Sequence, residues 1–384
     1  MKILIINWRD LKNPWTGGAE IHIHEIASRL VKEYGHQIFF LCNRFKNTLP
    51  PRDNYDGIEF YRVGTEYTFN FHVPFWLRKN LPQIHPDLII EDVNKIPFYT
   101  PLYVKRPVLV VIPHLFSETV FREINFVFGT YIYLAEKLIP EVYKNCYLNA
   151  ISQSTKEDLV KKGLSPDKIS VIECGIDQKT YYPANEKFGA PTVIYAGRLK
   201  KYKCVGHLLE AISLVRRKLP EVKLFVVGDG DYRQGLVAHA AKLNLKETVT
   251  FTGYISQQEK VELLQKSHLL VYPSIKEGWG ISNLEANACG TPVSAADVPG
   301  LRDSVSVGES GLLYSFGDVG KMAENILGIL TDTLLREKLE QGGLKWASNF
   351  TWEKTAERFN NLLKDLFSAL ETASKDTGEL YSGF

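Results

Sequence analysis

The sequence predicts an α/β protein made of two doubly wound, parallel-sheet domains, and three observations support this fold class. Short apolar runs alternate with amphipathic helical patterns from one end of the chain to the other, as in doubly wound sheets. Several runs, such as Val108–Ile112, are apolar at every position, which is typical of parallel strands buried on both faces. The length of 384 residues is enough for two domains of ordinary size.

The expected strands are the short apolar runs. In the first half of the chain they are Ile3–Ile6, Gln37–Cys42, Ile58–Arg62, Asp87–Ile90, Val108–Ile112 and Ser170–Ile172. In the second half they are Thr192–Ala196, Lys223–Val227, Val249–Thr252, His268–Tyr272 and Pro292–Ala295. Between them, apolar residues recur at helical spacing in Ala19–Tyr34, Leu208–Val215, Glu259–Leu264 and Leu335–Trp346.

The stretch Lys179–Pro191 is the expected boundary between the two domains. It carries proline, glycine and polar residues with little periodicity, and a clean strand pattern restarts at Thr192. We therefore expect a Rossmann-like domain at residues 1–182 and a second at 190–350, facing each other across a deep cleft.

The composition argues against several classes of protein. Its 45% hydrophobic and 23% charged residues are typical of soluble globular proteins, and the net charge of +2 argues against a strongly nucleic-acid-binding surface. No apolar run approaches the roughly 20 residues that span a bilayer. The N-terminus resembles a first strand more than a signal peptide. The five cysteines are scattered without metal-ligand spacing, which predicts reduced thiols in a cytoplasmic protein.

Two glutamates eight positions apart, Glu277 and Glu285, are the most informative feature of the sequence. The apolar run before them and the helical pattern at Leu284–Ala288 place Glu277 in a strand-to-helix loop and Glu285 in the first helical turn. N–H groups at such a helix start bind phosphate, and Gly278 and Gly280 let a ligand approach the main chain. The stretch can therefore hold a nucleotide diphosphate between two carboxylates, and the alternative is a plain tight turn.

Other candidate residues follow expected strands, at the edge where open α/β sheets bind ligands. Gly17 and Gly18 open the first helix and suit close approach to an anion. His114 suits hydrogen bonding or proton handling at a reacting hydroxyl. Arg198 and Lys203 can clamp a diphosphate and neutralise a leaving group without a metal. The structural alternatives are a plain turn, a satisfied histidine and solvated surface charges.

Two more segments have weaker signals. Asp229-Gly230-Asp231 follows a strand as some divalent-cation sites do, but we interpret it as a glycine-rich turn and expect no metal. Aromatic and basic residues cluster in Phe69–Lys79, which we interpret as a helix entry with core aromatics. Contact with a membrane surface or a lipid acceptor is the alternative.

Taken in order along the chain, these motifs resemble those of the retaining glycosyltransferases of family 4, which have the GT-B architecture. The resemblance covers nearly all of residues 1–365, and its strength lies in the ordered series rather than in one motif. The residues that carry it are Gly17–Glu20, His114, Ile151–Thr155, Val171–Asp177, Ala196–Leu199, Lys203, Val227–Gly230, Phe251–Gly253 and Glu277–Glu285.

The resemblance implies that the second domain holds most of a nucleotide-sugar donor. Arg198 and Lys203 would bind the diphosphate, Glu277 would lie near the donor sugar, and Glu285 would take the ribose hydroxyls. The other implied donor contacts are the amides of Gly280, Ile281 and Ser282, the backbone near Tyr254 for the base, and the loop of Gly17 and Gly18.

The resemblance also implies that His114 lies near the anomeric centre and that the last helix, about residues 351–368, crosses back onto the first domain. Two positions depart from the family pattern. Cys174 stands where asparagine is common, and Cys204 stands where glycine is common. The departure at Cys204 puts a side chain next to the expected phosphate clamp.

The resulting hypothesis is a metal-independent, retaining hexosyltransferase with His114, Glu277, Arg198 and Lys203 in catalysis and no cofactor. It would move a hexosyl group from a UDP- or GDP-sugar to a sugar or lipid-linked acceptor in glycan, glycolipid or cell-envelope polysaccharide synthesis. The expected location is the cytoplasm, with peripheral contact at the inner face of the membrane left open and no nucleic-acid partner. The alternatives are a GT-B epimerase or phosphorylase and a non-catalytic sugar-nucleotide-binding subunit.

Overall fold

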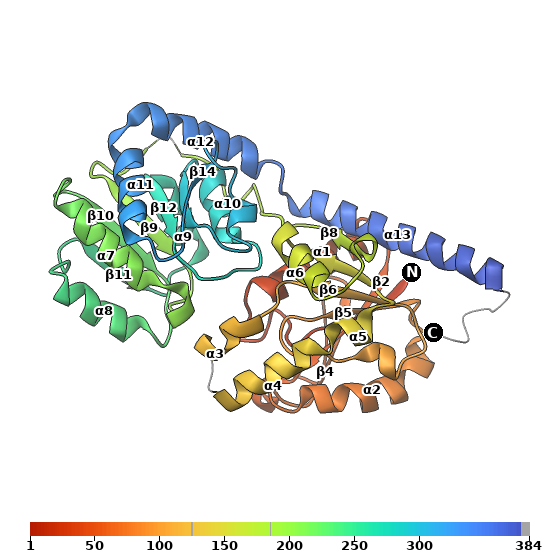
Figure 1. Cartoon of the computed structure of the whole chain (residues 1–384). Coiled ribbons are helices and arrows are strands. Elements are labelled where there is room, and N and C mark those ends of the chain that lie inside the picture. The colour runs from red at the N-terminus through yellow and green to blue at the C-terminus, as the bar shows by residue number, and fades with distance from the viewer. Residues whose placement is uncertain (124–125, 185, 378–384) are drawn as a thin grey trace. The chain divides into compact units, whose positions relative to one another are not determined.

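The computed structural model describes residues 1–123, 126–184 and 186–377. The chain forms two compact units: Met1–Gly175 with the last helix make unit 1, and Ile176–Thr351 make unit 2. Each unit has its own mainly parallel sheet with helices packed around it (Figure 1), which confirms the predicted α/β class.

Unit 1 contains a sheet of order β3-β4-β2-β1-β5-β6-β7-β8, in which β3 and β4 are antiparallel and the other pairs are parallel. Its strands are β1 (Lys2–Ile6), β2 (Gln37–Asn43), β3 (Arg52–Tyr55), β4 (Ile58–Val63), β5 (Leu88–Asp92), β6 (Val108–Ile112), β7 (Tyr147–Ala150) and β8 (Ile169–Val171). Its helices are α1 (Gly18–Lys32), α2 (Phe69–Ile84), α3 (Val120–Glu123), α4 (Phe126–Lys137), α5 (Ile139–Tyr143), α6 (Gln153–Lys161) and α13 (Trp352–Thr377).

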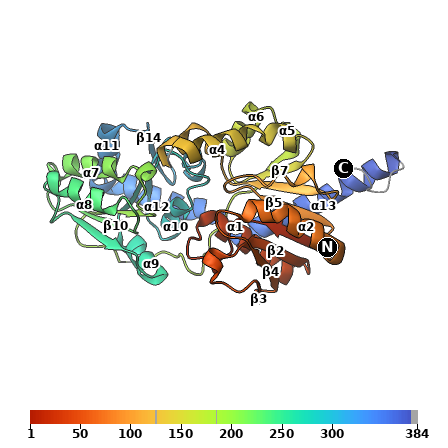
Figure 2. The ribbon, with the colours of Figure 1, turned by 90° about the horizontal axis from the view of Figure 1, so that it is seen from below.

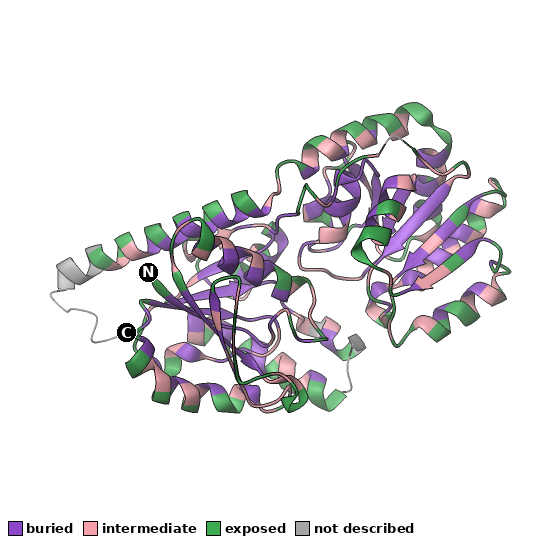
Figure 3. Cartoon of the chain, turned by 180° about the vertical axis from the view of Figure 1, so that it is seen from behind, coloured by how far each residue is buried: buried purple, intermediate pink, exposed green. Residues whose placement is uncertain are grey.

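Both faces of this sheet are buried, which explains why its strands are apolar at successive positions. Leu4 and Ile6 of β1 belong to one apolar cluster, while Ile3 and Ile5 belong to the cluster on the other face. Figure 3 shows the central strands of each unit mostly in the colour of buried residues, whereas β3 at the edge of the unit 1 sheet has none. The sequence missed β3 and β7 because their residues, Arg52–Tyr55 and Tyr147–Ala150, interrupt the apolar pattern with polar side chains.

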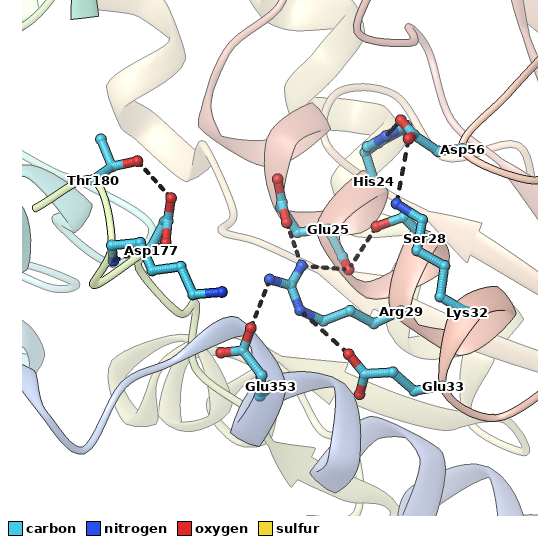
Figure 4. Close-up of polar contacts among 11 residues, drawn as sticks. His24, Glu25, Ser28, Arg29, Lys32, Glu33, Asp56, Asp177, Thr180 and Glu353 are labelled. Carbon is cyan, nitrogen blue, oxygen red and sulfur yellow. Dashed lines mark hydrogen bonds and ion pairs between the residues drawn. The ribbon is translucent and has the colours of Figure 1, made fainter. Parts of the chain in front are cut away.

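The last helix, α13, packs on unit 1 beside α1. Its residues Phe359 and Leu363 are fully buried in the cluster that contains Ile3 and Ile5. An ion pair between Arg29 of α1 and Glu353 of α13, 2.9 Å long, joins the two helices at the surface (Figure 4). The helix continues to Thr377, beyond the end expected near residue 368.

Unit 2 contains a sheet of order β11-β10-β9-β12-β13-β14 with all pairs parallel. Its strands are β9 (Thr192–Ala196), β10 (Lys223–Val227), β11 (Val249–Gly253), β12 (Leu269–Tyr272), β13 (Val293–Ala296) and β14 (Gly311–Tyr314). Its helices are α7 (Val205–Arg216), α8 (Arg233–Lys242), α9 (Gln257–Lys266), α10 (Ile281–Ala288), α11 (Val319–Thr331) and α12 (Thr333–Ala347). The winding direction reverses between β9 and β12, and in unit 1 it reverses between β1 and β5.

Among the described residues, no helix is long and apolar enough to span a membrane.

Candidate functional site

The carboxyl edge of the unit 2 sheet brings two predicted residues together at the point where the winding reverses. Lys203 follows β9, Glu277 follows β12, and the two strands are neighbours. The Lys203 Nζ lies 2.5 Å from the Glu277 Oε1, and the two side chains are only 7% and 16% exposed. Open α/β sheets bind ligands at this reversal point. The pair therefore marks a candidate ligand site within unit 2.

Aromatic side chains surround the Lys203 ammonium. Its Nζ lies 5.0 Å from the centre of the Tyr202 ring and 5.3 Å from that of Tyr272, and it donates to the Tyr272 hydroxyl at 3.4 Å. Burial by itself would lower the pKa of Lys203, but Glu277 and the tyrosine hydroxyls outweigh burial and raise the pKa above its ordinary value. Lys203 is therefore positively charged at neutral pH, in a site that excludes most water.

Arg198 lies two residues beyond the end of β9 and is exposed. The Tyr195 hydroxyl donates to its carbonyl oxygen at 3.0 Å, which fixes the backbone at the start of this loop. Cys204, directly after Lys203, adopts a left-handed conformation with φ of 52°, a region that favours glycine. The predicted clamp thus has one exposed and one buried cation.

The loop after β10 packs against the loop after β9. A Cβ atom at Gly230 would lie 2.3 Å from the Leu199 carbonyl oxygen, so glycine is required there by packing. Asp231 forms an ion pair with Lys200 at 2.8 Å. These contacts favour the interpretation of Asp229–Asp231 as a turn.

Helix α10 begins three residues earlier than the sequence pattern suggested. Because the helix runs from Ile281, Glu285 lies in its second turn, and the expectation of a first-turn position is wrong. Gly280 precedes the helix with φ of 77°, and a Cβ atom there would lie 2.7 Å from the Ser304 Oγ. Glycine lets the chain turn sharply here, so that the N–H groups at Ile281 and Ser282 form the helix start.

Glu285 is buried and already has a charged partner. The Lys260 ammonium of α9 donates to both of its carboxylate oxygens at 3.0 Å, and Lys260 lies 5.1 Å from the centre of the Tyr181 ring. A carboxylate has about four acceptor positions, so Glu285 can accept further hydrogen bonds. Lys260 carried no signal in the sequence, because it lies within a helical pattern that is charged on its exposed side.

Tyr254 follows Gly253 at the end of β11 and is almost fully exposed. Tyr254 and Lys203 both follow the carboxyl ends of strands in the unit 2 sheet, but β11 is two strands away from β9. Tyr254 is not among the contacts given above for Lys203.

In unit 1, Gly17 and Gly18 lie at the start of α1, as predicted from the sequence. The Gly17 N–H donates to the Glu20 carboxylate at 2.8 Å, which is one half of a capping box, since glycine has no side chain to supply the other half. The Asn94 amide, which follows β5, donates to the other Glu20 oxygen at 3.3 Å and to the Asn7 side chain at 2.9 Å. This polar network lies at the reversal point between β1 and β5.

The sequence included Glu20 in a motif but missed both asparagines, although each directly follows an expected strand or lies close to its end. A Cβ atom at Gly18 would meet no atom within 4 Å, so packing does not require glycine at that position. Burial and the nearby Glu20 raise the pKa of Asp92, which ends β5, well above its ordinary value.

His114 lies two residues after β6 and is half-buried. Its ring is 4.7 Å from that of Phe116 in an edge-on arrangement. The Thr155 hydroxyl donates to the carbonyl oxygen of Pro113 at 3.2 Å and so holds the backbone just before His114. His114 thus lies at the carboxyl edge of the unit 1 sheet, the position that the sequence predicted.

Comparison with known families and proteins places the chain among glycosyltransferases. Residues 16–180 match the model described as Glycosyltransferase Family 4, and residues 178–346 match the model described as Glycosyl transferases group 1. A D-inositol 3-phosphate glycosyltransferase of Stackebrandtia nassauensis is 34% identical over 210 residues, which are 50% of this chain and 47% of that protein. One from Thermobispora bispora is 28% identical over 59% of this chain and 56% of that protein. The chain spans about half the length of these curated relatives.

Two solved structures share the fold over nearly the whole chain. Sucrose-phosphate synthase from Thermosynechococcus elongatus has a TM-score of 0.80 at 21% identity, covering 96% of this chain and 99% of that one. The Anabaena protein HepE, in complex with UDP and glucose, has a TM-score of 0.75 at 19% identity, covering 95% and 100%. The two matched family models adjoin and together run from residue 16 to residue 346. The chain therefore belongs to the family 4 glycosyltransferases of the GT-B fold.

Proposed function

We propose that this protein transfers a hexosyl group from a nucleotide-diphosphate sugar to an acceptor hydroxyl with retention at the anomeric carbon. The observation that carries the proposal is the buried Lys203–Glu277 pair at the reversal point of the unit 2 sheet. It combines a fixed positive charge and a carboxylate at the edge where such sheets bind ligands. Diphosphate and sugar hydroxyls are the ligands that this combination recognises.

The departing diphosphate gains negative charge as the sugar–oxygen bond breaks, so groups that stabilise this charge accelerate the reaction. An ammonium has three N–H donors, and Glu277 and Tyr272 take two of those of Lys203 within the described residues. In the proposal, the third donor and the exposed Arg198 bind the diphosphate, together with the N–H groups at the start of α10. These charges replace a metal, and the proposal includes no cofactor.

The proposed donor orientation follows from the two carboxylates. Glu285 accepts hydrogen bonds from the ribose hydroxyls while it stays paired with Lys260, because its oxygens retain acceptor positions. Glu277 accepts a hydrogen bond from a hydroxyl of the donor sugar. It is not assigned as a covalent nucleophile; one of its oxygens accepts a hydrogen bond from Lys203. The base lies beside Tyr254.

In the proposed transfer, the bond between the anomeric carbon and the diphosphate oxygen breaks, and the acceptor oxygen bonds to that carbon on the same face. The acceptor proton passes to the departing phosphate oxygen. The roles of His114 beside the anomeric centre and of the Gly17–Gly18 loop at the phosphate stay predictions, as do the cleft between the domains and the cytoplasmic location.

The relatives guide the choice of substrates. HepE was solved with UDP and glucose, which supports a UDP-sugar donor over a GDP-sugar. The curated relatives are named for D-inositol 3-phosphate, which supports a small polyol phosphate as one acceptor to test beside sugar and lipid-linked acceptors.

The proposal is tested with a panel of UDP-, GDP- and ADP-sugars, scored by thermal shift and by release of nucleoside diphosphate. The double variant Arg198→Ala, Lys203→Ala should lose at least about 2–3 kcal/mol of transition-state stabilisation. Lys200→Ala is the matched control, because Lys200 lies in the same loop and pairs with Asp231. Wild-type turnover by the double variant would refute the proposed clamp. Epimerised nucleotide sugar, phosphate-dependent sugar release, or donor binding without transfer to any acceptor would favour the alternative functions.

A further inference from the structure

Helix α2 of unit 1 exposes two aromatic side chains away from the candidate site. Phe71 and Phe75 lie one helical turn apart, and Phe75 is 76% exposed. Phe69 is buried in the core, so the expectation of core aromatics in Phe69–Lys79 holds for Phe69 and is wrong for Phe71 and Phe75. Single exposed apolar side chains are common, but a contiguous patch of them over neighbouring helices marks an interaction surface.

Helix α4 adds such a surface. Along α4 and at Leu138, the residue that follows it, four large apolar residues recur at intervals of four, three and four positions and are all exposed, with Val127 at 75%. These residues are Val127, Tyr131, Leu134 and Leu138. The opposite side of the helix faces the protein, since Gly129 and Glu136 are buried. The exposed stripe is therefore not the side that α4 uses for packing.

The two helices are neighbours. The Asn70 side chain of α2 donates to the Tyr131 hydroxyl of α4 at 3.3 Å. Figure 1 shows both helices along the lower side of unit 1, and Figure 2 views the molecule from that side. We call the surface of Phe71, Phe75, Val127, Tyr131, Leu134 and Leu138 the α2–α4 face.

The charges of these helices have one sign at the surface. The sequence of α2 contains no acidic residue, and its exposed charges are Arg78 and Lys79. The sequence of α4 contains one acid, Glu136, which is buried and accepts hydrogen bonds from the N–H groups of Phe116 and Ser117. Lys137 is exposed at the end of α4.

A groove of about 580 Å³ borders the α2–α4 face between α2 and the β3–β4 edge of the sheet. Its aromatic walls include Tyr61 and Trp76, whose ring centres are 5.0 Å apart. Lys79 and Arg52 line the same groove, and the Arg52 guanidinium lies 5.2 Å from the centre of the Tyr61 ring. Apolar walls beside cations match an amphiphile with a negatively charged headgroup.

We propose that the α2–α4 face docks unit 1 on an anionic lipid bilayer. The apolar stripes enter the boundary between headgroups and acyl chains, and Arg78, Lys79 and Lys137 contact anionic headgroups. With 12 residues, α4 is much shorter than the roughly 20 residues of a spanning helix, so it lies along the surface. The docking does not depend on the proposed transfer reaction.

The proposal is tested by flotation of the full chain with vesicles of phosphatidylcholine, with and without an equal share of phosphatidylglycerol. We expect binding to the mixed vesicles that weakens as salt rises. Val127→Glu, Leu134→Glu should weaken this binding more than about tenfold, because the inserted apolar area is lost. Arg78→Gln, Lys79→Gln should weaken it about tenfold or more on mixed vesicles and leave phosphatidylcholine binding unchanged.

Leu334→Glu is the matched control, because Leu334 is an 80% exposed leucine on α12 of unit 2. It should float as the wild type does. Phe75→Glu gives a second test on α2 that does not rely on α4. Nucleoside-diphosphate binding, measured by thermal shift, should be unchanged in all these variants and so separates a failure of docking from a failure of the donor site.

Three results would overturn the proposal. They are no flotation of the wild type above the phosphatidylcholine level, wild-type flotation by both Phe75→Glu and the double variant Val127→Glu, Leu134→Glu, or an equal loss of flotation in Leu334→Glu. A concentration-dependent dimer in light scattering that Val127→Glu, Leu134→Glu abolishes, without vesicle binding by the wild type, would instead assign the face to a second copy of the chain.

Discussion

Replacement of Lys203 by methionine is expected to destabilise unit 2 strongly while leaving unit 1 unaffected. Methionine keeps most of the side-chain volume but removes the charge, so the Glu277 carboxylate loses its partner 2.5 Å away. The carboxylate is then held in a site where only 16% of its side chain reaches water. A buried charge without a partner is the main cost of this substitution.

Removal of one partner from a buried ion pair typically costs about 3–5 kcal/mol. The lower end, about 3 kcal/mol, applies here because water reaches part of the Glu277 side chain. The control is Lys200→Met in the same loop, whose pair with Asp231 is 42% and 70% exposed and should contribute less than about 1 kcal/mol. Since the pKa of Lys203 is raised above its ordinary value, its contribution is present at neutral pH and is lost only as pH rises through that raised value.

Hydrogen exchange measured by mass spectrometry separates the two units. A loss of about 3 kcal/mol corresponds to about a hundredfold lower protection of the amides in β9 and β12, with β1 of unit 1 as the internal reference. The reasoning is refuted if Lys203→Met lowers this protection no more than Lys200→Met does. It is also refuted if protection in β1 falls by the same factor.

Three further predictions follow from single residues. Gly18→Ala should keep or raise the melting temperature, because the added Cβ meets no atom within 4 Å. It should lower kcat/KM if a donor phosphate uses the space beside Gly18, and an unchanged kcat/KM would contradict that role of the loop. Burial lowers the pKa of His22 to about 4 in the folded protein, so as pH falls the unfolded chain binds a proton at His22 before the folded chain does. Urea titrations should therefore show a loss of about 3 kcal/mol of stability between about pH 6.5 and pH 4. His22→Gln should lack this loss, and an identical pH profile would rule the assignment out. Gly280→Ala should cost about 1–3 kcal/mol in unfolding experiments, because φ is 77° and the Cβ would lie 2.7 Å from Ser304; a neutral result would show that the turn relaxes.

The local features of unit 2 were largely predictable from the sequence. The strands Thr192–Ala196 and Lys223–Val227 have the expected bounds, because every residue after the first in each strand is apolar, as is typical of a buried parallel strand. The start of α10 was misplaced by three residues, since Ile281 and Ser282 follow glycines that conceal the helical pattern. Strand β14 was missed because it is a short strand at the sheet edge that begins with a glycine.

The order of the motifs, the alternation of strands and helices, and the position of each candidate residue after its strand are properties of the sequence by itself, because they depend on neighbours along the chain. The pairing of Lys203 with Glu277, 74 positions away, depends on β9 lying beside β12, and that strand order is decided only when the sheet assembles. The pairing of Lys260 with Glu285 likewise depends on tertiary packing. So does the exposure of the apolar stripe on α4, because helical spacing of apolar residues is the same whether that helix face is buried or open to solvent. Periodicity therefore predicted which elements form, and tertiary packing decided which side chains meet.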